Sequence, residues 1–219
     1  PSVRGLAPSA RGLHTNYNSS NPRIDVIDDV VNVHGGTFTT ASWGNARTTT
    51  YTSISADSDD IIFTHRIPWT QSQSNSGGTP SRPQAWAKNI FSIGGVAHYD
   101  NADSSDDSWS GGGGSTGPAS DGRIKPDLCA YYDSIGTSDL SGSSGYSSGN
   151  WYSGFGGTSG ATPMVAGHNA LAIQMYTDAL FGNTLRVPGG TRSQNRPYAQ
   201  TLKALMIAKV LIGIGVAAF

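Results

Sequence analysis

Short apolar runs recur along the first two thirds of the chain and predict β-strands. In each run apolar residues alternate with polar ones or follow one another as β-branched side chains, and Gly, Ser or Asn bounds several of the runs. The predicted strands lie at about Arg11–Tyr17, Asp29–His34, Pro68–Gln73, Ile90–Ala97 and Asp127–Tyr131.

Helical periodicity occurs between and after these strands. Residues 53–65 bring three isoleucines and Phe63 onto the buried face of a helix that opens near Asp57. Residues 159–176 are apolar on nearly every side, as expected for a central buried helix. Strands that alternate with helices form parallel βαβ units, so the sequence predicts an α/β fold in three layers, a parallel sheet with helices on both faces. No repeat or linker divides residues 1–219, which we interpret as one domain.

The remaining segments are loops and an apolar C-terminus. Residues 100–122 and 139–154 are rich in Asp, Ser and Gly and are predicted to be surface loops. Residues 202–219 are apolar but contain Lys203 and Lys209, and the stretch after Lys209 is shorter than the ~20 residues that span a bilayer. We therefore expect a core helix or a buried strand there rather than a membrane anchor.

Composition and charge exclude some classes of function. The 219 residues carry 14 Lys+Arg against 15 Asp+Glu, a net charge of -1, which provides no basic face for nucleic acid. The single cysteine, Cys129, excludes an internal disulfide and a zinc site built from cysteines. Low charge with much Ser, Thr and Gly favours a secreted or extracytoplasmic protein. The first residues lack the features of a signal peptide, so an exported protein would be represented here by a processed or partial chain.

The most informative motif is Gly-Gly-Thr-Ser-Gly-Ala-Thr-Pro-Met-Val-Ala-Gly at residues 156–167. A serine in the first turn of a helix exposes its hydroxyl, and its backbone N–H has no intrahelical partner and can stabilise an oxyanion. The alternative is that Thr158 or Ser159 is only a helix N-cap. A nucleophile elbow of the α/β-hydrolase type is excluded by chain order, because the only histidine after Ser159 is His168, within the same predicted helix. Dinucleotide and phosphate-loop patterns also fail in the glycine-rich stretches.

The run from Gly157 to Gly167 resembles the serine motif of the subtilisin-like serine proteases, including a proline inside the first turns of an apolar helix. This resemblance implies a subtilisin-like fold and a serine endopeptidase that acts on polypeptides through an acyl-enzyme, with Ser159 as nucleophile. Three further segments are similar to that family: residues 5–10, residues 29–36 and residues 125–128.

Residues 72–78 resemble the family's oxyanion-hole segment, which implies that the side chain of Asn75 faces the scissile carbonyl. The alternative is an ordinary turn asparagine ahead of Gly77 and Gly78. Ser74 stands where the family usually has glycine. The resemblance also implies substrate-binding positions at Ser72, Gln73 and Ser74 and, at the rim of the cleft, at His34, Gly35 and Gly36.

The general base is missing from the motifs that the chain carries. In the family the catalytic Asp and His lie upstream of the segment at residues 5–10, so we expect the N-terminal portion of the domain to be missing and the chain alone to be inactive. His34 follows three aspartates and imitates the histidine motif, but the sequence after it has no helical apolar face. The alternative function is a relative that binds peptides without cutting them.

We expect no required cofactor, with calcium possible at the acidic loop of residues 100–107. That loop lacks the spacing of a known calcium loop, which favours a solvated acidic loop. The expected partner is a polypeptide substrate, and neither nucleic acid nor a membrane.

Overall fold

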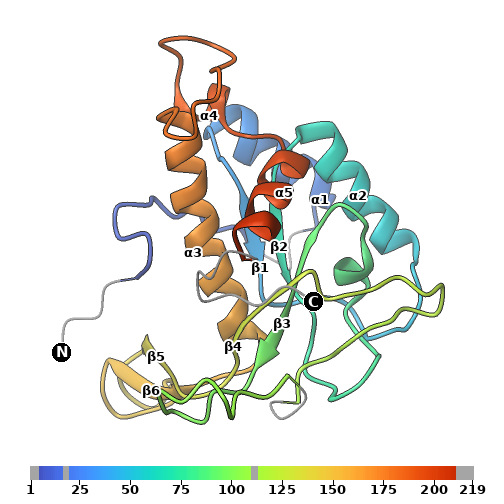
Figure 1. Ribbon diagram of the computed structural model, residues 1–219, viewed down its shortest axis with the longest axis vertical. Coiled ribbons are helices and arrows are strands. Elements are labelled where there is room, and N and C mark those ends of the chain that lie inside the picture. Colours follow the sequence, from blue (N-terminus) through green and yellow to red (C-terminus); the bar gives the residue numbers. More distant parts are fainter. Residues whose placement is uncertain (1–4, 17–19, 110–112, 211–219) are drawn as a thin grey trace.

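A parallel four-stranded sheet forms the centre of the protein in a computed structural model that describes residues 5–16, 20–109 and 113–210 (Figure 1). The strands follow the spatial order β1-β2-β3-β4, and all three pairings are parallel. The predicted α/β class is therefore confirmed, and every strand of this sheet ends at the same edge. Their bounds are β1 Thr39–Ala41, β2 Trp69–Ser72, β3 Phe91–Val96 and β4 Leu128–Tyr131.

Helices and a separate hairpin surround this sheet. The hairpin pairs β5 (Ile135–Ser138) with β6 (Trp151–Phe155) in antiparallel fashion and lies just before the longest described helix. The α-helices are α1 Arg23–Asp28, α2 Ser53–His65, α3 Thr158–Thr177, α4 Arg192–Asn195 and α5 Ala199–Val210, with a π-helix at Asp29–Val33 and a 3-10 helix at Pro83–Trp86.

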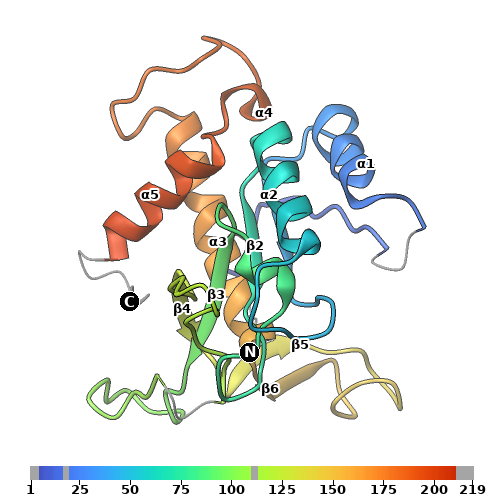
Figure 2. The same ribbon diagram turned by 90° about the vertical axis from the view of Figure 1, so that its right-hand side faces the viewer.

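The strand register divides the core into two clusters, one on each face of the sheet. Side chains alternate between faces along a strand, so Thr70, Ser72 and their partners on β3 face α3, whereas Trp69 and Gln71 face α2. Figures 1 and 2 show the sheet between these helices, with α5 beside α3. The first cluster joins Phe91, Ile93, Leu128, Val165, Ile173, Leu202 and Met206, and the second joins Ile27, Val31, Ile61, Ile62, Ile67, Trp69 and Ile90.

The structure confirms the two long predicted helices. Helix α2 begins after Thr52, which forms a capping box with Ser55, four residues before the start expected near Asp57. It ends at Arg66, whose φ of 51° is left-handed and cannot continue the helix. Phe63 was predicted to be buried, but it is 74% exposed because it lies on the opposite side of α2 from Ile61 and Ile62.

The first two predicted strands are wrong. Residues 11–16 have no regular secondary structure, and Tyr17 lies outside the described residues. Residues 29–33 form a π-helix that continues α1, with only Val30 and Val31 buried. A short apolar run fits a buried helical turn as well as a strand. Here the two adjacent valines are both buried, which a helical turn allows and a strand, with side chains on alternating faces, does not favour. The strand of this region is β1, which is three residues long and begins six residues after the end of the π-helix.

The apolar C-terminal region begins as a helix. Leu202 and Met206 of α5 are buried against α3, which agrees with the predicted core helix. Residues 211–219 lie outside the described part of the chain. Within residues 5–16, 20–109 and 113–210, no helix combines the length and apolar character needed to cross a membrane.

Candidate active site

The carboxyl ends of the parallel strands bring together residues that are far apart in the sequence. Ser42 follows β1, Ser72 ends β2 and Tyr132 follows β4, and α3 begins at the same edge. Figure 1 shows the first turn of α3 beside the ends of these strands, at the lower end of the molecule. This edge is where open α/β sheets usually bind ligands.

Gly157 sets the start of α3. Its φ of 81° is a conformation that glycine adopts without strain, and its N–H donates to the carbonyl of Tyr132 at 2.6 Å. A Cβ at this position would lie 3.0 Å from Nδ2 of Asn75, closer than side chains normally pack. The absence of a side chain therefore lets Asn75 approach the helix terminus.

Asn75 is held against the first residue of α3. Its Oδ1 accepts hydrogen bonds from the backbone N–H of Thr158 and from the Thr158 hydroxyl, both at 2.9 Å. Because both bonds use Oδ1, they fix the plane of the amide and leave the Nδ2 hydrogens for another acceptor. Arg47 donates to the main-chain oxygen of Asn75 at 3.3 Å.

Ser159 follows Thr158 and is half-buried at the helix start. In an α-helix its carbonyl would accept from the N–H four residues later, but residue 163 is proline and has no N–H. The Ser42 hydroxyl takes this place and donates to the Ser159 carbonyl at 3.0 Å. The Ser159 hydroxyl in turn donates to the Ser42 carbonyl at 3.3 Å. Pro163 thus helps to tie the nucleophile candidate to the end of β1.

Ser72, Gln73 and Ser74 lie beside the site with their side chains buried. Thr158 has one hydroxyl hydrogen, which it donates to Asn75, so the Ser72 hydroxyl is the donor in its 2.9 Å contact with Thr158. Gln73 is fully buried and uses its amide for hydrogen bonds with Ser81 and Ser92. Ser72 and Gln73 therefore position the strand end that leads to Asn75.

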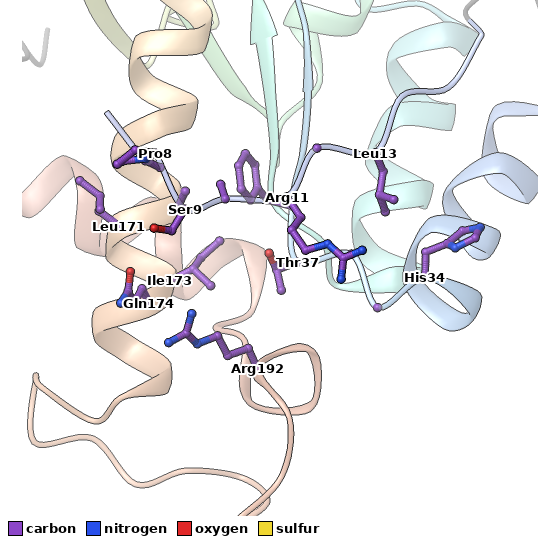
Figure 3. A pocket seen from close by; sticks show the side chains of 17 residues that line it. Pro8, Ser9, Arg11, Leu13, His34, Thr37, Leu171, Ile173, Gln174 and Arg192 are labelled. Atoms are coloured by element: carbon purple, nitrogen blue, oxygen red, sulfur yellow. The ribbon is translucent and has the colours of Figure 1, made fainter. Parts of the chain in front are cut away.

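The structure does not bring His34, Gly35 and Gly36 together with Ser159. These residues precede β1 and lie at the amino end of the sheet, where they line a groove of about 590 Å³ with residues 7–13, part of α3 and Arg192 (Figure 3). The α3 residues of this groove begin at Ala170, which is about 16 Å from Ser159 along the helix axis. Ser42, which follows β1, is the residue from this part of the chain that contacts Ser159.

All five histidines lie in the described part of the chain, and none hydrogen bonds to Ser159 there. His168 contacts the carbonyl of Met164 one turn earlier on α3, and Nδ1 of His98 accepts from the N–H of Asp100. His65 lies 3.7 Å from Asp28 at the end of α2. The arrangement thus shows a serine and an amide that could stabilise charge, without a histidine as their neighbour among the described residues.

The acidic loop of residues 100–107 is held by hydrogen bonds among its own residues. Asn101 binds Asp106 and receives the N–H of Asp103, while Asp103 accepts from Ser105. These hydrogen bonds use carboxylate oxygens within the loop. Among the described residues, no group of three or more His, Cys, Asp or Glu side chains converges as metal ligands. Calcium binding at this loop stays a prediction.

Sequence analysis missed the contributions of Ser42 and Thr158. Thr158 belongs to the motif, but its hydroxyl role depends on Asn75 and Ser72, which are more than eighty positions away. For Ser42 the signal was weak, because β1 has three residues and only Ala41 is buried. The Ser-Trp-Gly sequence directly after this strand was the feature that could have marked it.

Solved structures with the same fold include several proteases. The patellamide maturation protease PatA has 17% sequence identity and a TM-score of 0.56, over 95% of this chain and 79% of that one. The prenylagaramide maturation protease PagA has 19% identity and a TM-score of 0.56, over 94% and 76%. Sphericase has 16% identity and a TM-score of 0.52, over 84% and 52%. No curated protein matches the sequence at a significant level.

The subtilase family, peptidase S8, matches residues 10–209 of the sequence. This match includes all four strands of the sheet, Asn75 and the whole of α3. The chain belongs to the subtilase family.

Proposed function

We propose that this protein is a serine endopeptidase in which Ser159 is the nucleophile and Asn75 stabilises the oxyanion. The observation that carries the proposal is the pair of hydrogen bonds from Thr158 to Oδ1 of Asn75. They orient the Asn75 amide at the start of α3, the helix that carries Ser159. Such pre-oriented donors lower the energy of a tetrahedral intermediate without reorganisation during the reaction.

The reaction follows from these positions. The Ser159 oxygen attacks the scissile carbonyl while its proton moves to a general base, and the carbonyl oxygen becomes an oxyanion. Nδ2 of Asn75 and the backbone N–H of Ser159 donate to that oxyanion. The C–N bond then breaks as the base returns the proton to the leaving amine, and water hydrolyses the acyl-enzyme by the same route. None of the five histidines hydrogen bonds to Ser159 in its described position.

We assign the extended substrate to the segment that follows β1. Ser42 directly follows β1, which is an outer strand of the sheet and pairs with β2 alone among the described strands. A polypeptide can add to such an edge through main-chain hydrogen bonds.

The Ser-, Thr- and Gly-rich composition supports action outside the cytoplasm, which fractionation of cells that produce the full-length protein would test.

The test uses the full-length protein with Ser159→Ala and Asn75→Leu. Ser159→Ala should abolish acylation and labelling by an organophosphorus reagent. Asn75→Leu should lower kcat by about 10²- to 10³-fold with little change in substrate binding, because its hydrogen bond forms mainly in the transition state. Steady-state kinetics and mass spectrometry of the labelled protein measure both effects.

Two results would contradict the assignment. An Asn75→Leu enzyme with unchanged kcat would exclude the oxyanion role, and labelling of the Ser159→Ala protein at its active site would exclude the nucleophile. The alternative, a peptide-binding protein without catalysis, is supported by the distance of the histidines from Ser159. It predicts that unsubstituted full-length protein binds peptides but neither cleaves them nor reacts with the reagent.

A further inference from the structure

A partly exposed aromatic cluster lies on the hairpin that leads into α3. Tyr146 and Tyr152 stack with their ring centroids 5.3 Å apart, and Phe155 meets Tyr146 in an edge arrangement at 5.9 Å. We call these three side chains the aromatic platform. Tyr146 is 72% exposed, although its ring is the one shared by both contacts. Tyr152 and Phe155 are partly exposed. Exposed aromatic side chains that pack on one another are frequent at binding sites.

One end of the platform lies against the first turn of the serine helix. Phe155 is the last residue of β6, and only three residues separate it from Ser159. A Cβ at Gly160 would lie 3.3 Å from Cδ1 of Phe155, which shows how closely that ring approaches the helix. Both ribbon views place the β5–β6 hairpin beside the start of α3 (Figures 1 and 2). The platform therefore extends outward from the site proposed for catalysis.

The loop that carries Tyr146 is held by Asp139. The Asp139 carboxylate accepts the N–H groups of Leu140 at 2.9 Å, Tyr146 at 3.2 Å and Ser147 at 2.7 Å. The Asp139 N–H donates to the Asn150 carbonyl at 2.9 Å and closes the loop. These bonds fix the backbone at Tyr146 before any ligand arrives. A pre-organised ring loses less conformational entropy on binding than a mobile one.

Ser159 lies between two different surfaces. The Ser42 segment contacts it from β1, one outer strand of the sheet, whereas β6 leads to it through Gly156 and Gly157, next to Tyr132, which follows the other outer strand, β4. A peptide that extends from Ser42 past Ser159 would therefore approach the side on which the hairpin leads into α3. We propose that the aromatic platform binds an aromatic or large aliphatic side chain of the polypeptide substrate, in the half of the substrate that runs from Ser159 away from Ser42. This inference rests on the proposed function, because it takes Ser159 as the centre of the substrate site.

The chemistry of the platform favours an apolar occupant. None of its three rings carries a charge, and stacked or edge-on contact with another ring contributes energy beyond the burial of apolar area. Charged or small side chains would gain little from such a surface.

Peptide binding to the Ser159→Ala chain tests the inference without cleavage. The probes are fluorescent ten-residue Gly/Ser peptides in which a single Phe occupies each position in turn, and anisotropy gives Kd. We expect at least one Phe position to lower Kd by about 5- to 10-fold relative to the Gly/Ser parent. Tyr146→Ser should remove this advantage, whereas Tyr146→Leu should retain part of it.

Phe63→Ser is the matched control, because Phe63 is 74% exposed on α2 and lies outside the platform. That variant should keep the full preference for the Phe peptide. The inference is overturned if no Phe position improves binding, or if Tyr146→Ser retains the advantage. A Phe preference that depends on Tyr146 would support the inference even if the full-length protein fails to acylate at Ser159, a failure that would count against the proposed function alone.

Discussion

Ser74 adopts a backbone conformation that favours glycine. Its φ is 135°, and its carbonyl is fixed by a 2.6 Å hydrogen bond from the N–H of Ser115. A non-glycine residue in such a conformation stores about 1–3 kcal/mol of strain. Ser74→Gly should therefore raise the free energy of unfolding by about 1 kcal/mol, after the larger entropy of an unfolded glycine is subtracted. Urea unfolding measures this change.

The neighbouring Ser76 provides the control for this prediction. Its φ is not positive, and its hydroxyl donates to the carbonyl of Pro80 at 2.8 Å. Ser76→Gly should lower the free energy of unfolding because it removes that bond and adds a flexible residue. Equal losses of stability in Ser74→Gly and Ser76→Gly would show that Ser74 is not strained.

At this scale the sequence located residues but not their contacts. The glycine expected in the family at position 74 marked the unusual backbone, and the position of Asn75 ahead of two glycines marked the turn. The hydrogen bonds from Ser72 to Thr158 and from Thr158 to Asn75 were not predictable, because each joins two segments that lie far apart in the sequence. Hydrogen-bond partners follow from three-dimensional approach, which a local pattern does not encode.

The long helices and the buried strands β2, β3 and β4 were predictable, whereas the short elements between α1 and β1 were not. Helices α2 and α3 have enough turns for their apolar periodicity to define them, and β3 is a continuous buried run. The π-helix after α1 and the three-residue strand β1 lack this length, and tertiary packing decides their conformation.

A buried ionic cluster joins α5 to the sheet. Asp127, just before β4, accepts from Lys125 at 2.7 Å and from Lys203 of α5 at 2.8 Å. Burial lowers the pKa of Lys125 to about 8, and the attraction of Asp127 only partly opposes this shift. Below pH 8 Lys125 is charged in both the folded and unfolded states, and the cost of burying the charge is fully present. Above its ordinary pKa of 10.5 it is neutral in both states and the cost is absent.

The contribution of Lys125 to stability should therefore increase from pH 8 towards pH 10.5. Lys125→Met should remove this increase, and Asp127 would keep its partners Lys203 and the N–H of Ser92. The measurement is the free energy of unfolding in urea at several pH values, taken as the difference between the two proteins. Lys88→Met, at an exposed lysine, should leave the pH dependence as it is. A Lys125→Met protein with the same dependence as the unsubstituted chain would contradict the assigned pKa.

On the scale of the whole molecule, the parallel sheet brings together site residues that lie far apart in the sequence. Ser42, Asn75 and Ser159 span more than half of the chain, and parallel pairing brings their strand ends to one edge. The order of apolar segments predicted that edge correctly, because parallel connections place all carboxyl ends together. It could not predict the position of residues 34–36 at the opposite end, since that depends on which short run forms β1.

The same arrangement predicts the behaviour of the 219-residue chain by itself. None of its five histidines hydrogen bonds to Ser159 in the described structure, and the Ser159 hydroxyl instead donates to the Ser42 carbonyl. Oxyanion stabilisation and binding alone leave a serine protease about 10³- to 10⁴-fold above the uncatalysed reaction, far below a complete triad. We therefore expect very slow peptide hydrolysis by the purified chain, measured by mass spectrometry of a defined peptide. Because triad members act as a unit, Ser159→Ala should cost little further activity. Rapid hydrolysis that is sensitive to serine-directed inhibitors would contradict this prediction, and its loss in His34→Ala would identify His34 as a base that moves to Ser159.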